Sequence, residues 1–353
     1  MINCAAFNIA KNTQPIPQEP IVTRPIFLST PATQVPWAHN FQSVHDHRDL
    51  LNNSLNADFE YLVKVQVPDG LQKGQKITLQ TNDGPVEYIV YRKIAIDGLV
   101  SYAFKPFTEN HPPLIVFRCT EPNFRKEHSF HSMQNDTDPH LGERGWLAAR
   151  KTFEKLMKDR KFRGKGQKIK VAGYSLGGAH AQYFVAEHHA RVSHAIFYND
   201  PSIRADVVED FAKNVHEPIV IQIFRNSGDP FTHFGSKHLG CGVTHSNAQV
   251  QLLEIHTPQQ DRFNIDQHSK RIFKTDDYNY TVEEFTDPNV LAIKLDHTKR
   301  DPITIIAEKI RLFYGNLLSK MLGSASRFKT SCITFIEEEA RLPKKKKAPT
   351  LKN

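Results

Sequence analysis

A serine flanked by glycines lies where a strand-like run gives way to a helix-like run. Gly173, Tyr174, Ser175, Leu176 and Gly177 form the pattern G-x-S-x-G. Between a strand and a helix, this pattern predicts a sharp turn that holds the serine Oγ out as a nucleophile, rather than an ordinary loop that happens to contain serine. Glycines suit the two outer positions, because a side chain there would collide as the strand folds back against the helix.

A serine hydroxyl needs an imidazole to take its proton and a carboxylate to orient that imidazole. With this turn the partners follow in the order Ser, Asp, His, on loops at the carboxyl ends of strands. Asp229 comes directly after a strand-like run and lies on a Gly-Asp-Pro turn, so it is the predicted acid. Asp200, at the end of the preceding strand-like run, is the rival, and either aspartate could instead simply shape its turn before proline.

The base is harder to assign, because the chain has 18 histidines. The candidates after the predicted acid are His233, His238, His245, His256, His268 and His297. The base should follow the next strand-like run, at 250–255. His268, on a loop beyond that run, is the first choice, and His297, after a further strand-like run, is the second. His256 abuts the strand with little room to reach back. The three earlier histidines are expected to be structural, and His180 is expected to be a packing or surface residue.

An acyl-transfer site also needs two preorganised N–H donors for the developing oxyanion. Leu176, directly after the serine, is predicted to supply one through its backbone. The second should come from a loop after an earlier strand. Thr120 follows the apolar run at 114–119 and is the predicted second donor.

Composition excludes several other classes of protein. The chain has 353 residues, 39% of them hydrophobic, and a mean hydropathy of −0.49. It contains no apolar run near the ~20 residues of a membrane span. Four scattered cysteines form no C-x-x-C pair, and no cluster has zinc spacing, so we expect reduced thiols, no metal and no cofactor. No Sec-type signal is visible, which makes a cytoplasmic location the default and leaves non-classical export open.

Positive charge is concentrated at the C-terminus. The net charge is +8, and residues 341–353 hold six basic residues and no acidic one. The basicity therefore belongs mostly to a tail and not to a binding face, which argues against a nucleic-acid enzyme. Contact of this tail, including Lys344 to Lys347, and of the helix before it with anionic membrane is a further possibility.

The order of elements predicts one large α/β domain with extensions. Residues 1–56, rich in Pro and Asn, are expected to be a flexible leader. Residues 57–106 are expected to form an antiparallel β meander, as an accessory module or as the first part of the main sheet. Residues 107–300 alternate strands and helices, which predicts a mostly parallel, doubly wound sheet. A helical segment at 301–340, with a helix at 303–322, and a disordered basic tail at 341–353 complete the chain.

Four segments together resemble the class 3 lipases, the fungal triacylglycerol lipase-like family. They begin at Phe117 (F-R-C-T), His140 (H-L-G-E-R-G-W), Ala172 (A-G-Y-S-L-G-G-A) and Asn226 (N-S-G-D-P), and the resemblance covers about residues 85 to 275. It implies an α/β-hydrolase fold and hydrolysis of carboxylic esters of lipid-like substrates. It also implies the roles given above: Ser175 is the nucleophile, Asp229 orients the base, and Thr120 and Leu176 are the oxyanion donors. His268 fits the family's late histidine position only loosely.

This chain departs from the family pattern at several positions. Cys119 replaces a glycine before the oxyanion threonine. Tyr174 replaces the usual histidine of the strand-to-helix turn that holds the serine, which is called the nucleophile elbow. The segment from His140 to Gly145 carries extra residues. The family's lid should lie at residues 124–140, which here are largely polar. That composition favours smaller or water-soluble esters, or phospholipids, over strong activation at an oil–water interface.

The sequence therefore predicts a serine esterase or lipase that forms an acyl-enzyme on Ser175. Two alternatives stay open: a non-catalytic hydrolase-fold interaction protein, and an acyltransferase that uses the same residues. The acyl chain, the head group and the oligomeric state are not predicted by the sequence.

Overall fold

The computed structural model describes residues 54–81, 84–120, 129–138, 140–164, 166–243, 248–256, 268 and 281–297, and every structural statement here concerns these ranges. The predicted leader up to residue 53, the helix at 303–322 and the basic tail at 341–353 lie outside them. Within the described ranges, no helix is both long and apolar enough to cross a membrane.

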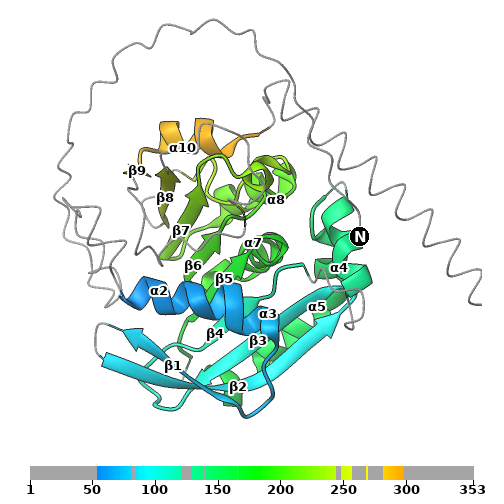
Figure 1. The fold of residues 1–353 in the computed structure, drawn as a ribbon, viewed down its shortest axis with the longest axis vertical. Helices are drawn as coiled ribbons and strands as arrows, with labels where there is room; N and C mark the ends of the chain where they lie inside the picture. The colour runs from blue at the N-terminus through cyan, green and yellow to red at the C-terminus, as the bar shows by residue number, and fades with distance from the viewer. Residues whose placement is uncertain are drawn as a thin grey trace, which may run out of the picture. The chain divides into compact units, whose positions relative to one another are not determined.

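A nine-stranded sheet forms the centre of the described domain, and its strands lie side by side in the order of the chain (Figure 1). The strands are β1 (Lys76–Thr81), β2 (Gly84–Ile96), β3 (Leu99–Pro106), β4 (Leu114–Phe117), β5 (Ile169–Tyr174), β6 (Val192–Tyr198), β7 (Ile219–Asn226), β8 (Ala248–His256) and β9 (Thr281–Phe285). Pairing is antiparallel from β1 to β4, parallel from β4 to β8, and antiparallel again at β9. The predicted meander is thus continuous with the main sheet, and the parallel centre agrees with the predicted α/β-hydrolase class.

Helices connect and cover these strands. They are α2 (Ser54–Tyr61), η2 (Leu62–Gln66), α3 (Val67–Asp69), α4 (Ser129–Thr137), α5 (Glu143–Lys158), α6 (Arg160–Arg163), α7 (Leu176–His188), η3 (His189–Arg191), α8 (Ala205–Asn214), η4 (Pro230–His233) and α10 (Pro288–Leu295). One face of α5 packs into the core, since Trp146, Phe153 and Leu156 are all buried there.

The winding of the sheet differs in one respect from the doubly wound prediction. Doubly wound sheets place crossover helices on both faces, because the strand order reverses at one point. Here the order never reverses, and right-handed crossovers that always step the same way put their helices on one face. Contacts of α7 with both α5 and α8 agree with this. The other face is contacted by the helix that precedes β1.

That helix corrects a second prediction, because residues 54–69 are helical where the sequence predicted the start of the β meander at 57–106. Glu60, Val63 and Val67 are buried, and this spacing matches one face of a helix. Short apolar runs with alternating valines fit either period, so the pattern alone was ambiguous. Lys64 pairs with Glu60 at 3.0 Å, and its ammonium lies 5.0 Å from the ring centroid of Tyr174 on β5.

A third correction concerns the segment before His297, which was predicted as strand-like. It forms α10, capped by Asp287, whose Oδ1 accepts a 2.7 Å hydrogen bond from the N–H of Asn289. An Asp-Pro pair at the start of a helix is a strong start signal, because the aspartate caps and the proline lacks the N–H that a first turn leaves unpaired.

Candidate active site

Ser175 lies in the turn between β5 and α7 with a φ of 55°, a conformation that residues other than glycine rarely adopt. The turn is possible only because its two glycines have no side chain. A Cβ on Gly173 would come within 2.3 Å of the carbonyl oxygen of Gly177, and a Cβ on Gly177 within 2.4 Å of that of Phe117. The strand-to-helix turn predicted from the sequence is therefore present, with the serine at its apex.

Two hydrogen bonds connect Ser175 to a histidine and an aspartate that are distant in the sequence. Nε2 of His268 lies 2.6 Å from Oγ of Ser175, and Nδ1 of His268 lies 2.8 Å from Oδ2 of Asp229. The Asp229 side chain is fully buried, and its Oδ1 accepts a 2.9 Å bond from the N–H of Phe231. The structure thus brings together the first-choice acid and the first-choice base beside the serine.

This arrangement fixes the proton positions needed for nucleophilic chemistry. A carboxylate accepts a hydrogen bond, so Nδ1 carries a proton and donates a hydrogen bond to Asp229. Nε2 of the neutral ring then accepts the hydroxyl proton of Ser175. A serine in this arrangement can attack a carbonyl carbon while its proton moves to the imidazole.

The imidazole of His268 is packed between two aromatic rings. The ring of Tyr174 stacks on it with centroids 5.1 Å apart, and the ring of Phe231 lies 4.3 Å away. The hydroxyl of Tyr174 also donates a 2.7 Å hydrogen bond to the main-chain carbonyl of His268, and Nδ2 of Asn199 donates a second one at 3.1 Å. Sequence reasoning missed this role of Asn199, for which the only signal was its place at the end of a strand.

Thr120 follows β4, which pairs in parallel with β5, so it lies at the same sheet edge as Ser175. The close approach of Gly177 to the carbonyls of Phe117 and Arg118 brings the chain after β4 against the start of α7, where Leu176 is the first residue. The hydroxyl of Thr120 donates a 2.6 Å hydrogen bond to Oδ2 of Asp136 on α4. No motif in the sequence pointed to Asp136, which belongs to the segment predicted as a lid.

Part of that predicted lid, residues 129–138, is described, and α4 is bound to its neighbours through Asn135. The side chain of Asn135 donates to the carbonyl of Asp97 at 2.9 Å and accepts from the N–H of Gly145 at 3.2 Å. These bonds connect α4 to the turn between β2 and β3 and to the first turn of α5. Residues 124–128 lie outside the described ranges.

A small cavity opens beside the serine. Its volume is about 90 Å³, and it is lined by Asp136, Thr137, Leu141, Ser175, Leu176, Pro201, Phe231 and Phe234. Apart from the serine and the two α4 residues, every lining side chain is apolar. The reactive hydroxyl therefore faces a narrow apolar space with polar groups on one side, as expected for a site that binds a small apolar group next to a polar reacting centre.

The rival acid belongs to a different cluster. Oδ2 of Asp200 lies 2.7 Å from Nε2 of His238 and accepts a 2.6 Å hydrogen bond from Nε2 of Gln182, and all three side chains are buried. This cluster ties the loop after β6 to α7. Both its histidine, expected to be structural, and its aspartate are occupied away from Ser175.

The alternative bases are likewise bound elsewhere. Nδ1 of His297 lies 3.2 Å from Oγ of Ser202, and burial lowers the pKa of His297 to about 2. Nε2 of His256 lies 3.6 Å from a carboxylate oxygen of Glu283. His180 is fully buried in α7, in line with a packing role, and His245 lies outside the described residues.

One group of side chains in the described ranges has the spacing of a metal site. Ligand atoms of Glu254, His256 and Glu283 lie within 4.8 Å of one another. However, Glu254 already accepts a 2.7 Å hydrogen bond from the ammonium of Lys294, a cation that would repel a metal ion. Nothing else at this sheet edge points to an ion.

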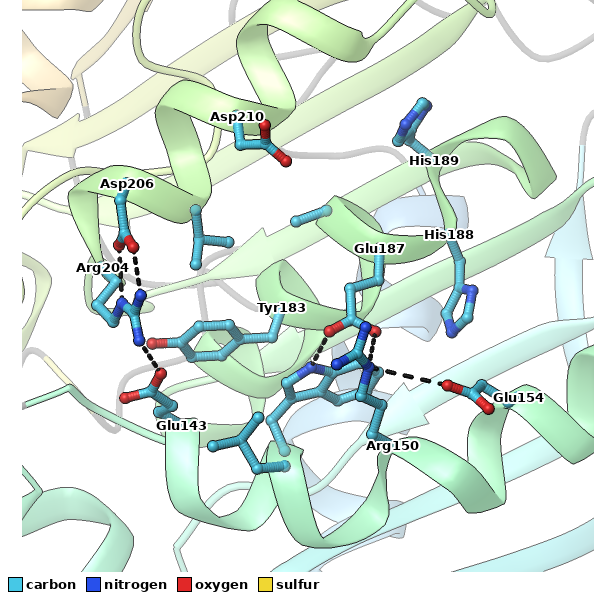
Figure 2. A pocket seen from close by; sticks show the side chains of 14 residues that line it. Glu143, Arg150, Glu154, Tyr183, Glu187, His188, His189, Arg204, Asp206 and Asp210 are labelled. Carbon is cyan, nitrogen blue, oxygen red and sulfur yellow. Dashed lines mark hydrogen bonds and ion pairs between the residues drawn. The ribbon is translucent and has the colours of Figure 1, made fainter.

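A larger hollow of about 830 Å³ lies on the helices α5, α7 and α8 and is lined mainly by charged side chains (Figure 2). Its described lining includes two histidines, His188 and His189, but no serine or cysteine that either could activate. The smaller cavity at Ser175 is therefore the candidate active site, although the hollow is much larger.

Comparison with known proteins gives matches in structure alone. No family model matches the sequence, and no curated protein matches it either. A triacylglycerol lipase with a serine protease triad matches at 12% identity and a TM-score of 0.34, over 60% of this chain and 80% of that one. The Rhizomucor miehei triacylglyceride lipase matches at 10% identity and 0.30, over 48% and 66%. A thermostable esterase matches at 15% and 0.32, over 56% and 58%.

At these identities and TM-scores the matches carry no evidence about activity. The class of the protein follows from its own geometry instead. A mostly parallel central sheet, flanking helices and a serine on a strand-to-helix turn fit an α/β-hydrolase fold.

Proposed function

We propose that this protein is a serine esterase or lipase that hydrolyses carboxylic esters of lipid-like substrates. The observation that carries the proposal is the chain of hydrogen bonds from Ser175 through His268 to Asp229, at 2.6 and 2.8 Å. Such a chain activates a serine hydroxyl at neutral pH. The conformation of the serine and the apolar lining of its cavity support the same proposal.

In the proposed reaction, Oγ of Ser175 attacks the ester carbonyl carbon while Nε2 of His268 takes the hydroxyl proton. The negative charge that develops on the carbonyl oxygen is stabilised by the backbone N–H groups of Leu176 and Thr120. The intermediate then collapses, and the leaving alcohol departs with the proton from His268. Asp229 stabilises the imidazolium between these steps.

Water completes the cycle. It attacks the acyl-enzyme carbonyl as His268 takes one of its protons, and that proton returns to Oγ of Ser175 as the carboxylic acid leaves. If an alcohol on another molecule took the place of water, the same residues would perform acyl transfer. Product analysis with an added alcohol acceptor distinguishes the two reactions.

The cavity suggests a small acyl group. Its volume is about 90 Å³, and five of its eight lining side chains are apolar. We therefore propose short-chain esters as the preferred substrates. This agrees with the weakly apolar lid inferred from the sequence. Membrane contact through residues 303–322 and Lys344 to Lys347 lies outside the described ranges and stays a prediction.

The decisive experiment combines turnover with active-site labelling. Ser175→Ala should abolish p-nitrophenyl acetate hydrolysis and labelling by a fluorophosphonate, because only an activated hydroxyl is phosphonylated. The thermal unfolding curve should stay the same. Wild-type protein that is folded but takes up no probe would instead support the non-catalytic interaction protein.

A further inference from the structure

The large hollow on the helices, called here the acidic groove, has no part in the proposed reaction. It crosses the outer sides of α5, α7 and α8 (Figure 2). Five of its lining side chains are carboxylates: Glu143, Glu154, Glu187, Asp206 and Asp210. Together they place negative charge from all three helices around one concave surface.

Two arginines in the acidic groove compensate only part of this charge. Nε of Arg150 lies 2.8 Å from Glu187 and 3.8 Å from Glu154. Arg204 similarly pairs with both Glu143 and Asp206. Each guanidinium is thus shared by two carboxylates, and one negative charge is left over in each cluster.

The remaining groups do not restore neutrality. Asp210 is exposed, and its Oδ1 accepts a 3.0 Å hydrogen bond from the neutral amide of Asn214. Burial lowers the pKa of His188 to about 4 and also lowers the pKa of His189, so neither imidazole adds positive charge near pH 7. With five carboxylates and two guanidinium groups, the acidic groove carries a net charge of about −3.

Two features indicate what the acidic groove could bind. The hydroxyl of Tyr183, a residue 2% exposed, has no hydrogen-bond partner among the described residues and points toward Arg204 and Glu143 in Figure 2. The side chain of Leu147, on the lining of the groove, is 56% exposed. A lysine side chain suits both, because its aliphatic stem covers apolar surface while its ammonium bonds to oxygen atoms.

The chain itself contains a segment of matching chemistry. Residues 341–353 hold six basic residues and no acidic one, including four consecutive lysines from Lys344 to Lys347. We propose that this C-terminal segment docks in the acidic groove of its own chain, with the lysine run lying among the carboxylates. Docking there would place the lysines against the groove side of α7, the helix that begins directly after the candidate nucleophile.

The length of the intervening chain and the strength of the ion pairs both allow such docking. Roughly 47 residues separate the last described residue, His297, from Lys344, and an extended chain of that length spans about 150 Å. Single exposed ion pairs contribute little, so several must form together, and salt must weaken them. Attachment to the same chain raises the effective concentration of the segment to the order of millimolar, at which weak binding is sufficient.

The test measures competition between the attached segment and a free one. A fluorescent peptide with the sequence of residues 341–353 is added to the full-length protein and to the variant K344Q/K345Q/K346Q/K347Q, with anisotropy as the readout. The variant should bind the peptide at least about tenfold more tightly than the wild-type protein, whose own segment occupies the groove. Raising the salt from about 50 to 300 mM should weaken this binding further.

A matched pair of substitutions on α8 locates the binding surface. Adding Asp206→Asn and Asp210→Asn to the quadruple variant should weaken peptide binding by about tenfold. Adding Glu209→Gln should leave it unchanged, because that neighbouring carboxylate pairs with Lys237 outside the groove, at 2.7 Å. The whole test is independent of ester hydrolysis, so it stands or fails separately from the proposed activity.

Four results would overturn the proposal. The first is equal peptide affinity for wild type and quadruple variant. The second is affinity that does not change with the two aspartates. The third is sedimentation that shows a wild-type dimer lost in the quadruple variant, which would assign the groove to a second copy. If the peptide fails to bind while the wild-type protein floats with phosphatidylserine vesicles, the lysines serve a membrane instead.

Discussion

The hydroxyl of Tyr174 donates a 2.7 Å hydrogen bond to the main-chain carbonyl of His268, 94 residues further along the chain. Tyr174 directly precedes the candidate nucleophile, so one residue of the elbow holds the backbone of the candidate base while its ring stacks on the imidazole. The class 3 lipases, which the sequence resembles, have histidine at this position. The departure noted in the sequence therefore has a structural role, which is to orient the residue that receives the serine proton.

Tyr174→Phe tests this role, because it removes the hydrogen bond and keeps the ring. A lost hydrogen bond of about 1.4 kcal/mol corresponds to a tenfold effect, so we expect kcat and the rate of fluorophosphonate labelling to fall about tenfold, with KM unchanged. Tyr198→Phe, on the adjacent strand, is the control and should keep both rates. A lower melting temperature with unchanged labelling would mean that Tyr174 is only structural.

Asp136 should act through Thr120, because its Oδ2 accepts a 2.6 Å hydrogen bond from the Thr120 hydroxyl. Losing one oxyanion donor typically costs 10²–10³ in kcat, so disturbing its orientation should cost on the order of tenfold. We expect Asp136→Ala to lower kcat by that amount in steady-state ester hydrolysis, and Asp136→Asn, which keeps an acceptor oxygen, to restore most of it. Equal activity of the two variants would contradict this role.

The sequence predicted those parts of the fold and site that depend on local constraints. The elbow could be predicted, because Gly173 and Gly177 have no space for a side chain. The strand end before Asp229 could be predicted, because a buried strand followed by Gly-Asp-Pro has few other interpretations. His268 could only be ranked among several histidines, since its selection depends on a contact with Ser175 across 93 residues of sequence.

The features of the fold and site that the sequence did not predict depend on tertiary contacts. The run at 61–67 alternates like a strand, yet it is helical, with Val63 and Val67 on its buried face. Asp136 and Asn199 contribute to the candidate site through single hydrogen bonds across the fold, which leave no periodic trace in the sequence. Asp200 was a reasonable rival by position, and the two aspartates are separated by their partners: Asp200 pairs with His238, whereas Asp229 pairs with His268.

The cavity beside Ser175 should set the acyl chain length. In a series of p-nitrophenyl esters, we expect kcat/KM for acetate and butyrate to exceed that for octanoate by at least about tenfold, because the longer chain does not fit about 90 Å³. Phe234→Ala should enlarge the cavity and move the optimum toward octanoate. Leu147→Ala, at the distant acidic groove, should leave the optimum where it is. An unchanged profile in Phe234→Ala would show that other residues limit the chain.

Stability should fall as the pH falls below about 6.5, because several buried histidines cannot bind protons in the folded state. Burial lowers the pKa values of His180 and His194 from 6.5 to about 3. Between these values the unfolded chain binds more protons than the folded one, so the free energy of unfolding drops by about 1.4 kcal/mol per pH unit for each such histidine. Above pH 6.5 both states are neutral and this contribution is constant.

Urea unfolding of wild type and His194→Gln between pH 7 and pH 4 measures the effect. Protonation of carboxylates affects both proteins alike, so the difference in slope isolates the histidine. The variant should lose stability less steeply, by about 1.4 kcal/mol per pH unit below pH 6.5. His140→Gln, at an exposed position, is the control and should reproduce the wild-type slope. Parallel curves for wild type and His194→Gln would mean that His194 becomes protonated without unfolding the protein.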